Sequence, residues 1–131
     1  MFEKMDILTK AVGLAKHAAA RQSVIAQNVA NADTPGYRAK DIASFADTFR
    51  TDDGSALRTT RARHLSGGAA AGHADLDPQT VFRAGAMSPN GNSVALEAEM
   101  MAAAEAKRDH DLALTVYKTS LGIMRTALGR R

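Results

Sequence analysis

The histidines are the first candidates for chemistry, because imidazole is the commonest metal ligand and carries protons near neutral pH. The sequence has four of them, His17, His64, His73 and His110. They are scattered, and no two lie at metal-ligand spacing. The acidic run Asp52-Asp53-Gly54 lacks the alternating ligands and closing glutamate of a calcium loop. We therefore expect no metal site, and we interpret His110, which falls in an apolar helical series, as a packing residue.

Phosphate-binding and nucleophile motifs are the next candidates. Gly67 and Gly72 have the separation of the glycines in a phosphate-binding loop, but His73 and Ala74 follow where Lys and Ser or Thr are required. The sequence has no Gly-x-Ser-x-Gly motif, and it has no cysteine, which excludes thiol nucleophiles, zinc–thiolate sites and disulfides. These observations predict a protein that is not an enzyme and holds no cofactor.

Basic charge is the remaining candidate. The chain has 17 Lys and Arg against 14 acidic residues, and the net charge of +3 is spread along the sequence. The densest cluster is Arg58, Arg61, Arg63 and His64, which we interpret as the solvated face of an edge strand. Nucleic-acid binders concentrate basic charge on one surface, so a small nucleic-acid-binding protein is only an alternative hypothesis, and steep salt-dependent binding to DNA would indicate it.

The elements that position these residues begin with two long helices. With 131 residues, the chain is long enough for one small domain. Residues 1–32 contain no proline, and their apolar residues recur at steps of three and four, which predicts a long amphipathic helix. A similar series predicts a second helix over residues 93–128, and Asn92 or Ser93 is its expected N-cap.

Each helix has a wide apolar surface. The first helix carries one heptad series and a second stripe beside it. The series is Met5, Leu8, Val12, Ala15, Ala19, Ala26 and Val29, and the stripe is Ile7, Ala11, Leu14, Ala18 and Ile25. We expect an antiparallel, coiled-coil-like pair that buries its remaining apolar surface against other chains. A monomeric hairpin with the middle segment folded over it is the alternative. The predicted assembly seam comprises Leu8, Val12, Ile25, Val29, Leu96, Met100, Leu114, Tyr117, Leu121, Met124 and Leu128.

The middle of the chain, residues 33–92, differs in composition from both helices. Pro35 and Gly36 suit the central positions of a type II turn, which would end the first helix. Ile42, Phe45, Ala46 and Phe49 predict a short amphipathic helix. Short strands are expected at residues 57–65 and 80–84, with a flexible loop at 66–72 between them. The sequence thus predicts a mainly α fold in three parts: helix 1–32, an irregular module 33–92 and helix 93–131.

One motif at the end of the first helix is specific. Residues 21–41, with Asn-Ala-Asp-Thr-Pro-Gly-Tyr at 31–37, closely resemble the N-terminal signature of bacterial flagellar rod and hook proteins, and the proximal rod branch in particular. Residues 91–100 and 59–65 are similar to two further segments of that family. The residues that match the signature are Asn28, Asn31, Asp33, Thr34, Pro35, Gly36 and Tyr37.

This resemblance implies a structural subunit of the flagellar basal body, whose terminal helices assemble into a tubular drive shaft and export conduit. It implies partners: further copies, rod subunits of the FlgC type, a FliE-type adaptor and the flagellar export gate. It also implies a rod in the periplasm and type III export without a cleaved signal peptide. The spread of basic charge predicts no nucleic-acid binding, and the lack of a long apolar run predicts no membrane insertion. A soluble helical adaptor or chaperone of a secretion system is the alternative, and a stable monomer bound to one client would indicate it.

Overall fold

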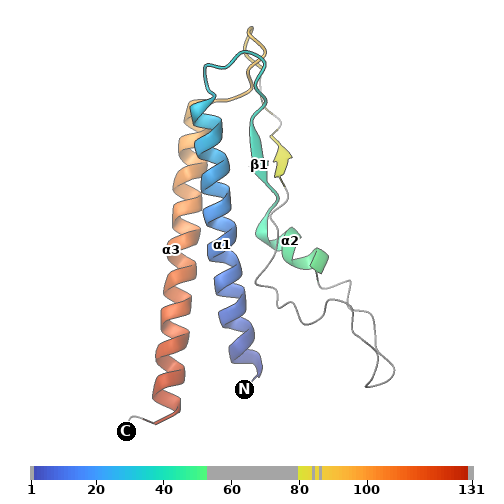
Figure 1. Cartoon of the computed structure of the whole chain (residues 1–131). Coiled ribbons are helices and arrows are strands. Elements are labelled where there is room, and N and C mark those ends of the chain that lie inside the picture. Colours follow the sequence, from blue (N-terminus) through green and yellow to red (C-terminus); the bar gives the residue numbers. More distant parts are fainter. Residues whose placement is uncertain (1, 53–79, 84, 86, 130–131) are drawn as a thin grey trace, which may run out of the picture.

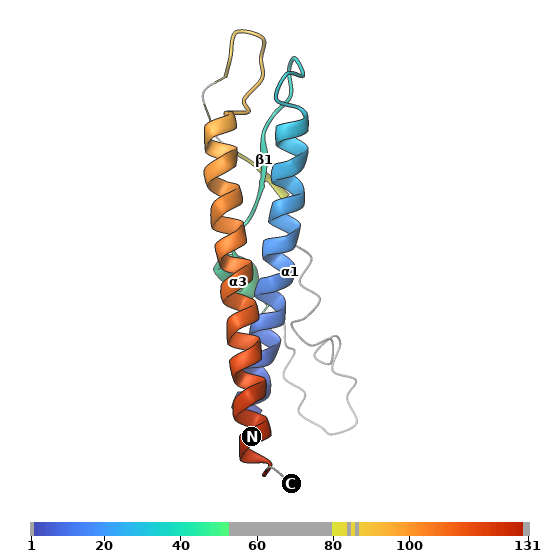
Figure 2. The same cartoon turned by 90° about the vertical axis from the view of Figure 1, so that its left-hand side faces the viewer.

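Two long helices dominate the computed structural model, which describes residues 2–52, 80–83, 85 and 87–129. Helix α1 spans Phe2–Ala30 and helix α3 spans Leu96–Ala127. They run antiparallel and side by side, so that both chain termini lie at the same end (Figures 1 and 2). The mainly α fold is confirmed. The strand predicted at 57–65 and the loop predicted at 66–72 lie outside the described residues.

The helix pair closes along residues spaced seven apart. On α1 these are Ala11, Ala18 and Ile25, all at most 5% exposed, and on α3 they include Ala106 and Ala113, each 1% exposed. Alanine lets two helix backbones approach closely, because its side chain ends at Cβ. The seam within the subunit is therefore the second of the two predicted stripes, and the heptad series lies beside it.

A small strand pair and a short helix lie on one side of the helix pair (Figure 1). Strand β1 spans Lys40–Ile42 and pairs antiparallel with β2, Thr80–Phe82, which confirms the strand expected at 80–84. Helix α2 spans Phe45–Asp52, where the short helix was predicted. Ile42, expected in that helix, instead lies buried on β1, because the helix begins only after Ser44.

Ser44 begins α2 by binding the first turn of the helix. Its Oγ accepts a hydrogen bond from the Asp47 backbone N–H at 3.2 Å and donates to the Asp47 carboxylate at 2.7 Å. This reciprocal arrangement satisfies one of the free N–H groups of the first turn. From α1, His17 Nε2 donates a hydrogen bond to the Ala43 carbonyl at 2.7 Å, and the His17 ring packs edge-on against Phe45. Helix α2 is thereby held against α1.

The predicted N-cap of the second long helix is wrong. Helix α3 begins at Leu96, and its N-cap is Ala95, which makes no side-chain capping bond. The Asn92 Nδ2 lies 2.7–3.0 Å from three backbone carbonyl oxygens just beyond α1, while Ser93 Oγ accepts from the Ala39 N–H. Neither side chain is therefore free to cap α3: Asn92 donates to carbonyls of the turn after α1, and Ser93 satisfies a backbone N–H before β1.

Two glycine turns contact each other at the end of the helix pair remote from the termini. The Tyr37 N–H donates to the Thr34 carbonyl at 3.3 Å and Gly36 has a φ of +72°, which are the features of the predicted type II turn. Gly91 has a φ of +79°, and a Cβ placed on it would lie 3.4 Å from the Gly36 Cα. The positive φ, more than the close approach of the two backbones, therefore favours glycine at 91.

A polar junction and an exposed helical face

Asn28, a signature residue near the end of α1, is fully buried. Its Nδ2 donates to the Lys40 carbonyl at 2.6 Å, and its Oδ1 accepts from the Lys40 N–H at 3.0 Å. The Tyr37 hydroxyl also donates to Oδ1, at 3.3 Å. A side-chain amide has the donor and acceptor of a peptide group, so Asn28 pairs with β1 as a neighbouring strand would. This contact fixes β1 against α1.

Glu99, in the first turn of α3, is 1% exposed and belongs to the same contact. Its Oε2 accepts from Asn28 Nδ2 at 3.1 Å, and its Oε1 accepts from Arg83 Nη1 at 2.8 Å. A buried carboxylate is costly unless its charge is paired and its oxygens are hydrogen-bonded. Both conditions are met here, by residues that come from α1 and from the segment after β2.

Asp41 on β1 connects two arginines. Its carboxylate accepts from Arg83 Nη2 at 2.7 Å and from Arg21 Nε at 3.1 Å. Arg21 also lies 3.6 Å from Glu105 on α3. We call Arg21, Asn28, Asp41, Arg83 and Glu99 the polar junction. It joins α1, β1, the segment after β2 and α3 through paired charges.

The charges of the junction shift two pKa values. Burial favours the neutral form of Asp41, but the hydrogen bonds from Arg21 and Arg83 outweigh it, so the pKa of Asp41 lies below its ordinary value. Burial likewise opposes the charge of Arg21, and the hydrogen bond and charge of Asp41 outweigh it, so the pKa of Arg21 is raised. The junction therefore holds Asp41 and Arg21 as an ion pair.

The signature residues contribute to two parts of the structure, the contact with β1 and the turn after α1. Asn28 and Tyr37 belong to the contact with β1. Asn31 and Thr34 bond locally, since Asn31 Nδ2 donates to the Gln27 carbonyl at 2.8 Å and Thr34 Oγ1 donates to Asn31 Oδ1 at 3.3 Å. The remaining residues lie in the exposed turn, and they are Asp33, Pro35 and Gly36.

The residues of the predicted assembly seam are largely left uncovered within the subunit. Of this set only Ile25 is buried in the helix pair. The half-buried members are Leu8, Val12, Tyr117, Leu121 and Met124. The exposed members are Val29, Leu96, Met100, Leu114 and Leu128. We call these ten residues the outer helical face.

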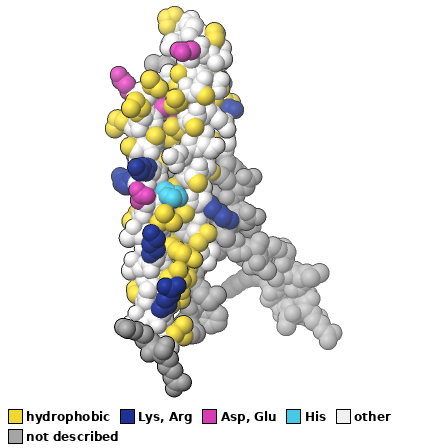
Figure 3. All heavy atoms as spheres, turned by 60° about the vertical axis from the view of Figure 1, so that its left-hand side comes forward, with side chains coloured by type: hydrophobic (Ala, Val, Ile, Leu, Met, Phe, Trp, Pro, Cys, Tyr) yellow, Lys and Arg dark blue, Asp and Glu magenta, His cyan; other side chains and the backbone are white. Residues whose placement is uncertain are grey.

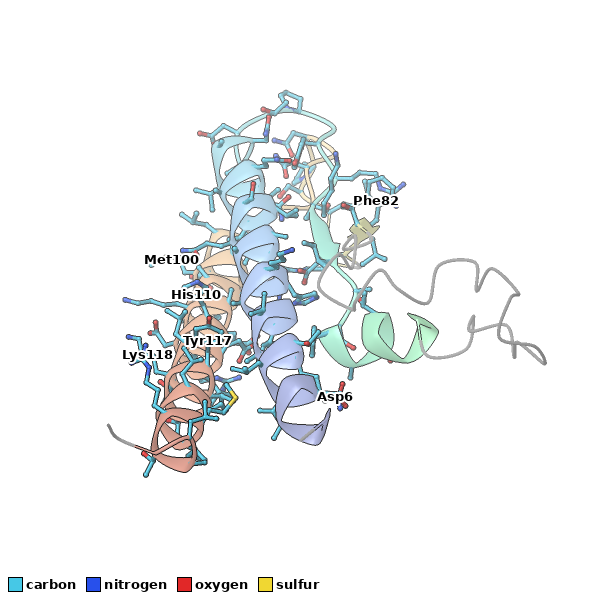
Figure 4. All side chains as sticks on the ribbon, turned by 60° about the horizontal axis from the view of Figure 1, so that its bottom comes forward. Asp6, Phe82, Met100, His110, Tyr117 and Lys118 are labelled. Carbon is cyan, nitrogen blue, oxygen red and sulfur yellow. The ribbon has the colours of Figure 1, made fainter. Side chains whose placement is uncertain are left out.

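Apolar side chains run along both helices on the face turned away from the strand pair (Figure 3). Met100, His110 and Tyr117 lie on the opposite side of the molecule from Phe82 on β2 (Figure 4). Between the helices, Val12, Leu114 and Tyr117 help to line an apolar groove of about 180 Å³. His110, interpreted as a packing residue, is half-buried. This face offers apolar surface and hollows, which suit the side chains of a neighbouring helix.

Nothing in the described part of the chain suggests a metal or membrane site. No group of three His, Asp or Glu residues there could hold a metal ion. None of the described helices is long and apolar enough to cross a membrane.

Sequence reasoning missed the polar junction as a unit. Glu99 had a usable signal, because it lies seven residues before Ala106 and so falls on the buried seam of α3. Arg83 and Asn92 had no comparable signal, since each is placed by contacts with residues far away in the sequence.

Comparison with known proteins decides between the alternatives. The family model described as "Flagella basal body rod protein" matches residues 11–38, which include the end of α1 and the signature turn. The flagellar basal body rod protein FlgB of Cereibacter sphaeroides is 32% identical over 111 residues, covering 82% of each chain. FlgB of Agrobacterium fabrum is 33% identical over 100 residues, covering 76% of this chain and 75% of the relative. FlgB of Salmonella typhimurium is 34% identical over 122 residues, covering 85% of each.

The chain belongs to the FlgB family of flagellar basal body rod proteins. It is a structural subunit of the proximal rod, and the adaptor and nucleic-acid-binding hypotheses are not favoured. The signature residues at 28–37 lie in the turn after α1 or in the contact between Asn28 and β1.

Proposed function

We propose that this FlgB-type subunit assembles into the rod through its outer helical face. The observation that carries the proposal is the exposure of large apolar side chains along both long helices, including Val29 at 42%, Met100 at 67% and Leu128 at 77%. Apolar surface exposed along two helices in this way is typical of protein–protein interfaces. Burying it against neighbouring helices supplies stabilisation of about 25 cal/mol per Å² of apolar area.

The partners that fit this surface are further copies of the subunit, FlgC-type rod subunits and a FliE-type adaptor, with the flagellar export gate beneath them. In this proposal the subunit is exported without a cleaved signal peptide, acts in the periplasm and has no enzymatic activity. Family membership and the apolar helical face support it. The rod built from such helices serves as both drive shaft and export conduit.

The test is a charge placed on the outer helical face. We expect Val29→Asp to abolish incorporation into the basal body while leaving synthesis intact, because the new carboxylate would be buried without a partner in the assembly. Val29 is exposed in the subunit, so the new carboxylate is not buried in the free chain. The measurement is quantitative mass spectrometry of purified basal bodies compared with whole cells.

Gln27→Asp is the matched control. Gln27 is exposed, lies in the same last turns of α1 and is outside the outer helical face, so it carries the same unfavourable interaction with the helix dipole. We expect this variant to assemble normally. Normal incorporation of Val29→Asp would contradict the proposal.

A further inference from the structure

The alanine seam between α1 and α3 does not by itself specify how the helices align. Ala11 and Ala113 line the same two grooves, so they face each other in the observed register. If α3 shifted by seven residues, about 10.5 Å along its axis, Ala18 would face Ala113 and Ile25 would face Ala106. Small apolar residues would again meet apolar residues. The shift would also disturb the hydrogen bonds by which Asn92 and Ser93, just before α3, bind the segment beyond α1, and the Asn92→Ala variant measures that contribution.

Glu99 breaks this repetition. It lies seven residues before Ala106 on the same buried face of α3, where its Oε2 accepts a hydrogen bond from Asn28. A shift in one direction carries Glu99 past the end of α1 and away from Asn28. A shift in the other direction moves its carboxylate from Asn28 to the level of Arg21, seven residues earlier on α1, whose guanidinium group already pairs with Asp41. The first shift leaves the carboxylate without the donor from Asn28, and the second replaces that donor with an arginine that another carboxylate already holds.

We propose that Glu99, through its contact with Asn28, specifies the register of α1 and α3. A single buried polar residue in an apolar helical seam is known to fix alignment at some cost in stability. Glu99 is thus a positioning residue for the assembled rod. Arg83 connects Glu99 to β1, because the Arg83 guanidinium group bonds both Glu99 and Asp41. The same carboxylate therefore sets the alignment of the helices and the place of the strand pair.

Disulfide formation can report the register, because the chain has no cysteine of its own. Ala113→Cys combined with Ala11→Cys reports the observed register. Ala113→Cys combined with Ala18→Cys reports the shifted one. A disulfide requires Cα atoms within about 7 Å, whereas positions 11 and 18 lie about 10.5 Å apart along the helix. Each pair therefore reports one register, measured as the intramolecular disulfide fraction by mass spectrometry of the dilute full-length chain.

We expect the otherwise unchanged chain to form the 11–113 disulfide and almost none at 18–113. Glu99→Ala should raise the ratio of the 18–113 to the 11–113 disulfide by at least about tenfold, which corresponds to about 1.4 kcal/mol. Moving the carboxylate with Glu99→Ala and Ala106→Glu together should make the 18–113 disulfide predominant, because the new glutamate meets Asn28 only in the shifted register. A residue that merely stabilised the fold would not move the preference.

Asn92→Ala is the control, because it removes three backbone contacts beside α1 without touching the seam. We expect it to retain the 11–113 disulfide. An unchanged ratio in folded Glu99→Ala, or a relocated variant that keeps the 11–113 disulfide, would overturn the proposal. So would a shift in Asn92→Ala as large as that in Glu99→Ala. Loss of the helical circular dichroism signal in both Glu99 variants would also overturn it, since the relocated variant restores the same contact.

Discussion

Asp41 shows how a single residue ties distant parts of this chain together. Its carboxylate binds Arg21 on α1 and Arg83 after β2, and its oxygens also accept the Ile42 N–H. The side chains of Asp41, Arg21 and Arg83 are 17–23% exposed, so the pairs are partly shielded from solvent screening. Because its pKa is lowered by these contacts, Asp41 makes the stability of the subunit depend on pH.

We expect the stability of the free subunit to fall below about pH 4 because Asp41 becomes protonated. Its folded pKa lies below the ordinary value of about 3.8. The stabilisation is therefore fully present above that value and is lost as pH falls through the folded pKa. Urea unfolding between pH 2 and pH 6, followed by circular dichroism, measures the effect at about unit intervals of pH.

Asp41→Asn should lower the free energy of unfolding at pH 6. It should also make the fall in stability between pH 6 and pH 2 less steep, because an amide neither pairs with the arginines nor titrates. Asp47→Asn is a suitable comparison, since Asp47 is exposed and its carboxylate accepts a hydrogen bond from Ser44 at the start of α2. If stability falls as steeply with decreasing pH in Asp41→Asn as in the unchanged chain, other groups control the loss of stability in acid.

At the scale of elements, two glycines differ in what their backbone positions require. The turn at Gly91 needs a positive φ and touches the turn at Gly36, whereas Gly122 lies within α3 with nothing within 4 Å of an added Cβ. The two glycines therefore have opposite effects on the stability of the subunit.

Gly91→Ala should destabilise the free subunit by about 1–2 kcal/mol, because an L side chain is strained in the left-handed region. Gly122→Ala should stabilise it by about 0.5–1 kcal/mol, because alanine favours the helix. Thermal unfolding of the two variants side by side measures both signs. An unchanged melting temperature in Gly91→Ala would contradict the expected strain at this positive φ.

The sequence predicted these elements unevenly. Helical periodicity and Pro35 placed both long helices and the end of α1, because those signals are local. The start of α3 was misplaced, because Asn92 and Ser93 bind distant backbone groups in preference to their own helix. Strand β1 was missed, since three residues carry almost no periodic pattern and Asn28 holds them from outside. The polar junction was beyond prediction because its members are brought together only by the fold.

At the scale of the whole molecule, the subunit is an elongated helix pair with more apolar surface than its own residues cover. Half of the outer helical face is exposed, while the seam within the pair consists mostly of alanine. Closing the pair therefore buries little apolar area for its length. The larger side chains, such as Leu114 and Met100, stay exposed in the subunit, and in our proposal they contact neighbours.

Self-association of the free subunit should depend on those side chains. We expect Leu114→Gln to weaken self-association by about tenfold or more, because it forfeits the burial of one leucine, worth about 1.5–3 kcal/mol. Sedimentation velocity over a range of concentrations measures the change. Thr119→Gln, at an exposed position of α3 outside the outer helical face, should associate as the unchanged chain does. Equal weakening by both variants would place the contact elsewhere on α3.

The pairing of Asn28 with Lys40 has a consequence for the behaviour of subunits before they reach the rod. An unpaired strand edge can pair with a strand of another chain, which leads to aggregation. The amide of Asn28 occupies both backbone groups of Lys40, and α1 lies along that edge of β1. The backbone groups of Lys40 are therefore unavailable to a strand of another chain, which removes one position at which edge-to-edge pairing through β1 could begin.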